Sequence, residues 1–137
     1  MEQETVQVEF PADKKYLSLI GALVQELCAT VRRLPASASY NIELAVNEAV
    51  VNVITHAYHD DPSGKVRLAF HIRPDALEIQ VRDWGLSFDP SAIQDPNLDE
   101  PHESGYGVYL IRQLMDRASY QPKTADGNLV TLIKNIS

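Results

Sequence analysis

The sequence contains few residues of several kinds, and each shortage excludes a class of protein. It has one cysteine, Cys28, so no disulfide can form within the chain and a thiolate zinc site cannot be built. Its 12 lysine and arginine residues are outnumbered by 19 aspartate and glutamate residues, and a formal charge of −7 argues against a basic face for nucleic acid. No apolar run has the length of a bilayer span, and the N-terminus lacks the pattern of a signal peptide. We therefore expect a cytoplasmic protein without a membrane or direct nucleic-acid partner.

The common motifs of nucleotide and metal enzymes are also missing. The one Gly-Lys pair, Gly64-Lys65, is followed by Val66, and His59 stands where a P-loop has its first glycine. The 4 histidines do not have the spacing of a zinc protease. Any phosphate must therefore be held by a different arrangement, through backbone N–H groups or a metal ion.

The remaining pattern predicts one α+β domain over residues 1–137. A chain of this length can bury a single core. Alternating apolar residues predict strands, and apolar residues at steps of three and four predict helices. The expected strands cover residues 5–10, 65–72, 77–83, 118–122 and 129–136, and the expected helices cover residues 16–31, 39–58 and 106–117. Because hairpins join neighbouring strands, we expect a two-layer α/β sandwich in which helices cover one face of the sheet.

Asp83 is the first candidate site residue, because strand alternation directs its side chain inward. A period of two carries the inward set of this strand from Leu77 and Ile79 to Asp83. An inward carboxylate is costly to bury without partners, so Asp83 needs hydrogen-bond donors. A backbone turn or Arg82 could supply them. We favour the amino group of a ligand, since Gly85 would let a ligand approach the backbone.

The second candidate is a row of polar residues in the predicted helix that contains "ELAVNEAVVNVITHAY". Glu48 and Asn52 are four residues apart and share one side of this helix, beside its apolar stripe. An amide oxygen is a hard neutral ligand suited to Mg²⁺, and a nearby carboxylate can accept a proton from a nucleophile. The same pair is also typical of a solvated helix flank, so by itself it does not decide between the two. His56, one turn further, is expected to support the helix end.

The third candidate is the stretch "SGYGVYLIRQLMD", in which Gly105 and Gly107 open an amphipathic helix. Helix N-termini expose unpaired N–H groups, and glycine lets phosphate oxygens come close to them. Glycines before helices are more often turns and caps, so this motif is weak on its own. A metal-ligand helix, a buried acceptor and a phosphate site together meet three needs of one Mg²⁺-nucleotide.

These motifs resemble those of the GHKL, or Bergerat-fold, ATPase superfamily, and most closely those of the bacterial anti-sigma-factor serine/threonine kinases. The stretch "NEAVVNVITHAY" resembles the N-box, "VRDWGLSFDP" the first glycine box and "SGYGVYLIRQLMD" the second. The proline-containing segment between the glycine boxes falls where the family has its ATP lid. The match covers nearly the whole chain and implies a mixed, mostly antiparallel sheet.

The resemblance also implies a role for each matching residue. Glu48 would be the general base and Asn52 the Mg²⁺ ligand. Asp83 would accept the adenine amino group, with Gly85 beneath the base. The residues expected to bind the phosphates are Gly105, Tyr106, Gly107 and Val108. ATP and Mg²⁺ are thus the expected ligands.

The function implied by the resemblance is that of a homodimer which binds a sigma factor and phosphorylates a serine on an antagonist protein. Two alternatives remain open. One is a binding module in which ADP or ATP orders the lid and sets the affinity for a partner, with negligible transfer. The other is the catalytic part of a sensor histidine kinase, which we disfavour because the chain leaves no room for a separate phosphoacceptor domain.

Two segments depart from the family pattern. Ser87 stands where the wider superfamily often has a second glycine in its first box, although the ending Ser-Phe-Asp resembles the anti-sigma subgroup. Asn128 and Leu129 follow Gly127, where many members have a threonine. Contacts with the base are therefore expected to differ here from those of the wider family.

Overall fold

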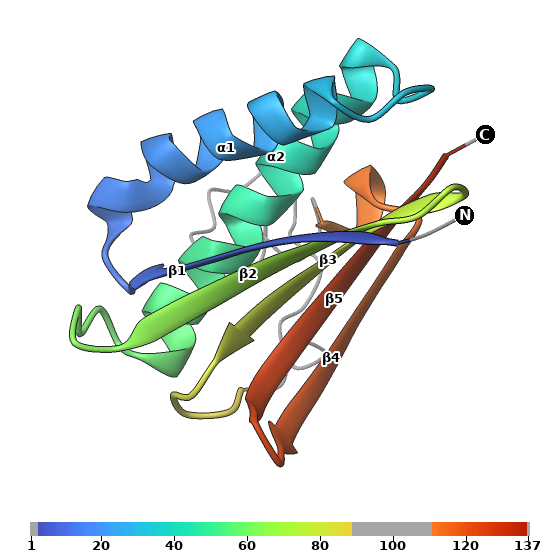
Figure 1. The fold of residues 1–137 in the computed structure, drawn as a ribbon. Helices are drawn as coiled ribbons and strands as arrows, with labels where there is room; N and C mark the ends of the chain where they lie inside the picture. Colours follow the sequence, from blue (N-terminus) through green and yellow to red (C-terminus); the bar gives the residue numbers. More distant parts are fainter. Residues whose placement is uncertain (1–2, 89–110, 137) are drawn as a thin grey trace, which may run out of the picture.

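A computed structural model of the chain describes residues 3–88 and 111–136, which form an antiparallel sheet with helices on one face (Figure 1). The elements in chain order are β1 (Glu4–Pro11), the 3-10 helix η1 (Lys14–Tyr16), α1 (Leu17–Ala29), α2 (Ala36–Asn52), the π-helix η2 (Val53–Ala57), β2 (Lys65–Ile72), β3 (Ala76–Asp83), β4 (Arg117–Thr124) and β5 (Gly127–Asn135). Figure 1 shows α1 and α2 together on one side of the strands. The predicted α+β two-layer sandwich is confirmed.

The strand order is β1-β2-β3-β5-β4, and every neighbouring pair in the described part of the chain is antiparallel. The sheet is therefore antiparallel there rather than mixed. The central strand β3 lies between β2 and β5, and its last residue, Asp83, is paired with Val66 on one side and Asn128 on the other. This register places a second polar residue directly beside the predicted acceptor.

The core lies between the sheet and the two long helices, as the apolar periods predict. Both helices turn an apolar stripe toward the alternate inward residues of the strands. The largest fully buried side chains of the core include Ile20, Val24, Ile42, Val46, Val50, Leu68, Phe70, Leu77, Ile79 and Leu132. Each such side chain stabilises the fold by about 1.5–3 kcal/mol relative to an exposed one. Asp83 lies in the same inward row of β3 and is fully buried.

The second helix has different boundaries from those predicted. It begins at Ala36 rather than Ser39, because Pro35, with φ −64°, already occupies the position before the first turn. Its regular α-helical part ends at Asn52, and a π-helix continues the chain to Ala57.

The predicted end of the third helix at Arg117 is wrong, because β4 begins at that residue. The described part of this helix covers residues 111–114. The Asp116 backbone N–H already donates to the carbonyl of Ile133 on β5 at 2.9 Å, so the chain has joined the sheet. In the parts of the chain that the structure describes, no helix has the length and apolar character needed to cross a membrane.

Candidate functional site

Asp83 is a buried carboxylate, and among the described residues only one of its two oxygens has hydrogen-bond donors. Its Oδ1 accepts hydrogen bonds from the Gly85 backbone N–H at 3.0 Å and from the Asn128 Nδ2 at 2.9 Å. Its Oδ2 is buried and has no hydrogen-bond partner among the described residues. Burial raises the pKa of Asp83, although the two hydrogen bonds oppose this shift. The buried position of Asp83 is the one predicted from strand alternation, and its second oxygen can accept a hydrogen bond from one more donor.

Arg82, the other donor considered from the sequence, is not a partner of Asp83. Adjacent strand residues point to opposite faces, so Arg82 lies on the outer face of the sheet. There it donates to the Asp126 carbonyl at 2.6 Å and lies 3.7 Å from the Asp126 carboxylate. The turn after β3 supplies one donor, and the neighbouring strand supplies the other.

Asn128 is the main residue of this cluster that the sequence did not assign to the site. It is 2% exposed, and its Nδ2 donates both to Asp83 and to the Gly85 carbonyl, the latter at 3.1 Å. Its Oδ1 accepts from the Ser87 Oγ at 2.6 Å and from the Lys123 backbone N–H at 3.0 Å. The two departures from the family pattern, Ser87 and Asn128, are therefore in direct contact. The departure of both residues from the family pattern was the sequence signal that could have assigned Asn128 to the site.

The loop after β3 is braced by the end of the second helix. The Tyr58 hydroxyl accepts from the Trp84 N–H at 2.8 Å and donates to the Lys65 carbonyl at 2.7 Å. The Leu86 N–H donates to the Ala57 carbonyl at 2.9 Å. A Cβ on Gly85 would lie 2.5 Å from that carbonyl oxygen, so glycine is required here by the chain's own backbone.

Glu48 and Asn52 lie on the part of α2 that leads into this brace. Asn52 is buried at 7% exposure, and Glu48 is partly buried, which raises the pKa of its carboxyl group. A helical rise of about 1.5 Å per residue separates the two by about 6 Å along the axis. Figure 1 shows the C-terminal end of α2 and the end of β3 on the same side of the molecule. Since Ala57 contacts the Gly85 loop, the helix end and Asp83 belong to one region.

His56 does not simply continue the row of Glu48 and Asn52. It lies in the π-helix, where the Tyr58 N–H donates to the Val53 carbonyl five residues earlier, so the turn is wider than an α-helical one. The His56 ring packs against Phe88 with a centroid distance of 5.3 Å. The structural role predicted for His56 agrees with this contact, and π-turns of this kind often occur at functional sites.

The predicted phosphate-binding residues Gly105, Tyr106, Gly107 and Val108 lie outside the described residues. Within residues 3–88 and 111–136, no group of three or more His, Cys, Asp or Glu side chains has an arrangement that could hold a metal ion. The structure thus brings Asp83, Gly85 and the end of α2 together and leaves the second glycine box undescribed.

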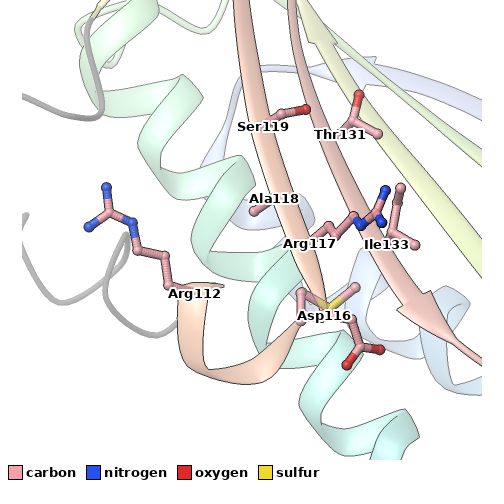
Figure 2. A pocket seen from close by; sticks show the side chains of 8 residues that line it. Arg112, Asp116, Arg117, Ala118, Ser119, Thr131 and Ile133 are labelled. Atoms are coloured by element: carbon pink, nitrogen blue, oxygen red, sulfur yellow. The ribbon is translucent and has the colours of Figure 1, made fainter.

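A hollow of about 580 Å³ beside β4 is a separate feature (Figure 2). It is lined by Arg112, Met115, Asp116, Arg117, Ala118, Ser119, Thr131 and Ile133. These include none of the predicted site residues. In Figure 2 Arg112 points away from the strands that carry Ser119 and Thr131, so the polar side chains do not converge on one ligand position. We therefore keep the candidate site at Asp83.

Comparison with known proteins shows the family to which the chain belongs. The family of histidine kinase-like ATPase domains matches residues 10–134. A serine-protein kinase RsbW from Oceanobacillus iheyensis is 32% identical over 121 residues, which cover 81% of this chain and 75% of that protein. A serine-protein kinase RsbW from Staphylococcus epidermidis is 31% identical over 147 aligned residues, which cover 98% of this chain and 88% of that protein. A serine-protein kinase RsbW from Bacillus subtilis is 29% identical over 124 residues, which cover 85% of this chain and 77% of that protein. The match of both the family and its relatives over most of the chain shows that the protein belongs to the family of histidine kinase-like ATPase domains.

Proposed function

We propose that the protein is an ATP-dependent serine-protein kinase of the anti-sigma-factor class, built from one kinase domain over residues 1–137. The observation that carries this proposal is the buried Oδ2 of Asp83, which has no hydrogen-bond donor in the part of the chain that the structure describes. A buried acceptor left without a donor costs about 1–3 kcal/mol, so it is expected to be completed by a ligand. The names of the similar proteins, serine-protein kinases, favour the same activity.

Adenine carries a hydrogen-bond donor of the kind that the Asp83 Oδ2 can accept. Its 6-amino group is a hydrogen-bond donor, whereas a 6-oxo purine would place an acceptor against the carboxylate. Gly85 and Leu86, held by Ala57, would form the floor beside the base. Asp83 would therefore select the nucleotide, and Gly105, Tyr106, Gly107 and Val108 are the proposed phosphate-binding residues.

Asn52 and Glu48 are proposed to serve the phosphoryl transfer. Bound ATP would supply the phosphoryl group, and Mg²⁺ would neutralise the charge of the triphosphate. Asn52 would hold the metal through its amide oxygen, which is consistent with a buried asparagine at the end of α2. Glu48 would accept the proton of the attacking serine hydroxyl, and the raised pKa of its carboxyl group makes it a better proton acceptor than an ordinary glutamate.

The partners we propose follow from the resemblance of the motifs. The protein would bind a sigma factor and transfer the phosphoryl group to a serine of a small antagonist protein. We place it in the cytoplasm, where both partners would be found, and propose that it acts as a homodimer. Sedimentation of the purified chain tests the dimer directly.

The variant Glu48→Ala tests the proposed reaction. We expect it to bind ATP with unchanged affinity but to lose transfer of labelled phosphate to the antagonist, because a removed base costs about 10²–10⁴-fold in rate. Calorimetry gives the affinity and phosphoserine detection gives the rate. Equal transfer by wild type and variant would refute the role of base. Nucleotide-dependent association without phosphoserine, in the wild type itself, would instead identify a binding module.

A further inference from the structure

Resting on the proposed adenine site, we propose that Asn128 is a positioning residue that sets the preference of this site for 6-amino over 6-oxo purines. Asn128 and Asp83 face each other as a register pair of β5 and β3, and both are buried. Asn128 is joined to the acceptor, to the loop after it and to the β4–β5 hairpin. It therefore connects β3, the loop after β3 and the β4–β5 hairpin around Asp83.

The orientation of the Asn128 amide is determined by two partners that have only one possible role. The Lys123 backbone N–H can only donate, so it must face the amide oxygen. The Gly85 carbonyl can only accept, so it must face the amide nitrogen. A rotated amide would oppose like groups at both places. The amide nitrogen is consequently held toward the Asp83 carboxylate.

Because the amide is fixed, the two oxygens of Asp83 have different roles. Oδ1 receives donors from Asn128 and Gly85 and is fully used, whereas Oδ2 is left as the acceptor for a ligand. Without Asn128, Asp83 would keep one donor, and the broad rotation of a carboxyl group would be less restricted. Loss of this hydrogen bond would also raise the pKa of Asp83 further and favour the protonated form, which donates to a 6-oxo group.

Asn128 acts through Asp83 rather than by touching the nucleotide. An asparagine side chain offers two N–H donors and two acceptor lone pairs. Contacts with Asp83, Gly85, Ser87 and Lys123 use all four. Among the described residues, the Ser87 hydroxyl is connected to Asp83 through its 2.6 Å hydrogen bond to the Asn128 Oδ1. Its removal should therefore matter only while Asn128 is present.

The test compares the affinities of ADP and inosine diphosphate, which differ at position 6 of the purine. Calorimetry is carried out on wild type, Asn128→Ala, Ser87→Ala and the double variant, with Asn135→Ala as a matched substitution on an exposed part of β5. We expect the wild type and Asn135→Ala to share one preference for ADP. Asn128→Ala should reduce this preference about tenfold, as for loss of one hydrogen bond to a charged group. Ser87→Ala should reduce it about threefold, and add nothing in the double variant.

The outcomes separate this proposal from the proposed function. If the wild type prefers ADP and Asn128→Ala keeps that preference, Asn128 has no positioning role, whereas the adenine site stands. If the wild type does not bind ADP, or does not distinguish it from inosine diphosphate, both proposals are wrong. Circular dichroism establishes that each variant is folded. Should Asn128→Ala not fold, an unchanged preference in Ser87→Ala would overturn the proposal by itself.

Discussion

Charged side chains have different surroundings on the two faces of the sheet. On the outer face, Glu9 lies 3.1 Å from Arg67, and Arg73 lies 2.9 Å from Glu78. These groups have ionic partners, and several remain partly open to solvent. On the inner face, Asp83 has no exposed surface and no cationic partner among the described residues, and one of its oxygens has no donor.

This difference is the reason why we propose a role beyond folding for Asp83. A pair of solvent-exposed charges changes the free energy of unfolding little. A buried carboxylate is costly, and a natural protein keeps one where the surrounding structure or a ligand compensates for it. Among the described residues, donors reach the Oδ1 of Asp83 but not its Oδ2. We propose that the remaining oxygen binds a ligand, and four substitutions or conditions test this contrast.

Asp83→Asn should have the largest effect on binding. The donors of Gly85 and Asn128 would hold the new amide oxygen in the place of Oδ1, so the amide nitrogen would face the ligand. We expect the affinity for ADP to fall about 10- to 100-fold and the preference to shift toward inosine diphosphate. The fluorescence of Trp84, the only tryptophan in the chain, can report the titration.

The nucleotide-free Asp83→Asn protein should be at least as stable as wild type. A raised pKa means that the fold favours the protonated carboxyl group, so the stabilisation present at low pH is lost as the pH rises through the folded-state pKa. The amide removes that charge at neutral pH. An unchanged ADP affinity in a folded variant would remove Asp83 from the site.

Gly85→Ala should destabilise the fold by about 1–3 kcal/mol, as for an overpacked position. Its Cβ would lie 2.5 Å from the Ala57 carbonyl oxygen, which is part of the backbone and cannot move aside cheaply. Gly21→Ala is the matched control, because the nearest atom there belongs to the flexible end of Glu43, at 3.0 Å. Urea denaturation measures both. Equal stabilities for the two variants would show that the close approach at Gly85 is unimportant.

Phosphotransfer should depend on pH through Glu48. Partial burial places its pKa above the ordinary value of 4.5, and only the carboxylate can accept a proton. The rate should be constant above this pKa and fall about tenfold for each pH unit below it. Single-turnover transfer across a pH series measures this. A rate that is flat down to the ordinary pKa of glutamate would argue against Glu48 as the base.

Glu9→Gln should have the smallest effect. The Glu9 carboxylate lies 3.1 Å from Arg67 and 3.8 Å from Lys65 in a solvent-accessible pair. Removing it should cost less than about 1 kcal/mol of stability and leave ADP affinity unchanged. Urea denaturation and calorimetry test both. A clear loss of ADP affinity would mean that the outer face is coupled to the site.

Much of the fold was predictable because its signals are local. Alternation and the helical period gave the five strands and the long helices in the right places, and alternation alone placed Asp83 in the core. The end of α2 was less predictable. Nothing in "VITHAY" distinguishes a π-turn from a continued α-helix, and the packing of Ala57 against Gly85 comes from residues distant in sequence.

The side-chain partner of Asp83 could not be predicted for the same reason. Asn128 is 45 residues away along the chain, and its contact depends on the register of β3 against β5. The sequence identified Ser87 and Asn128 as two separate departures from a family pattern. Only the folded sheet shows that they form one hydrogen-bonded unit.

The most direct test of the whole account is a crystal structure of the protein with bound ADP. The account predicts that the 6-amino nitrogen of adenine lies about 2.7–3.2 Å from the Asp83 Oδ2, with Oδ1 still bonded to Asn128 and Gly85. A complex in which the base lies elsewhere, while Oδ2 stays unmatched or is filled by a protein donor, would contradict it.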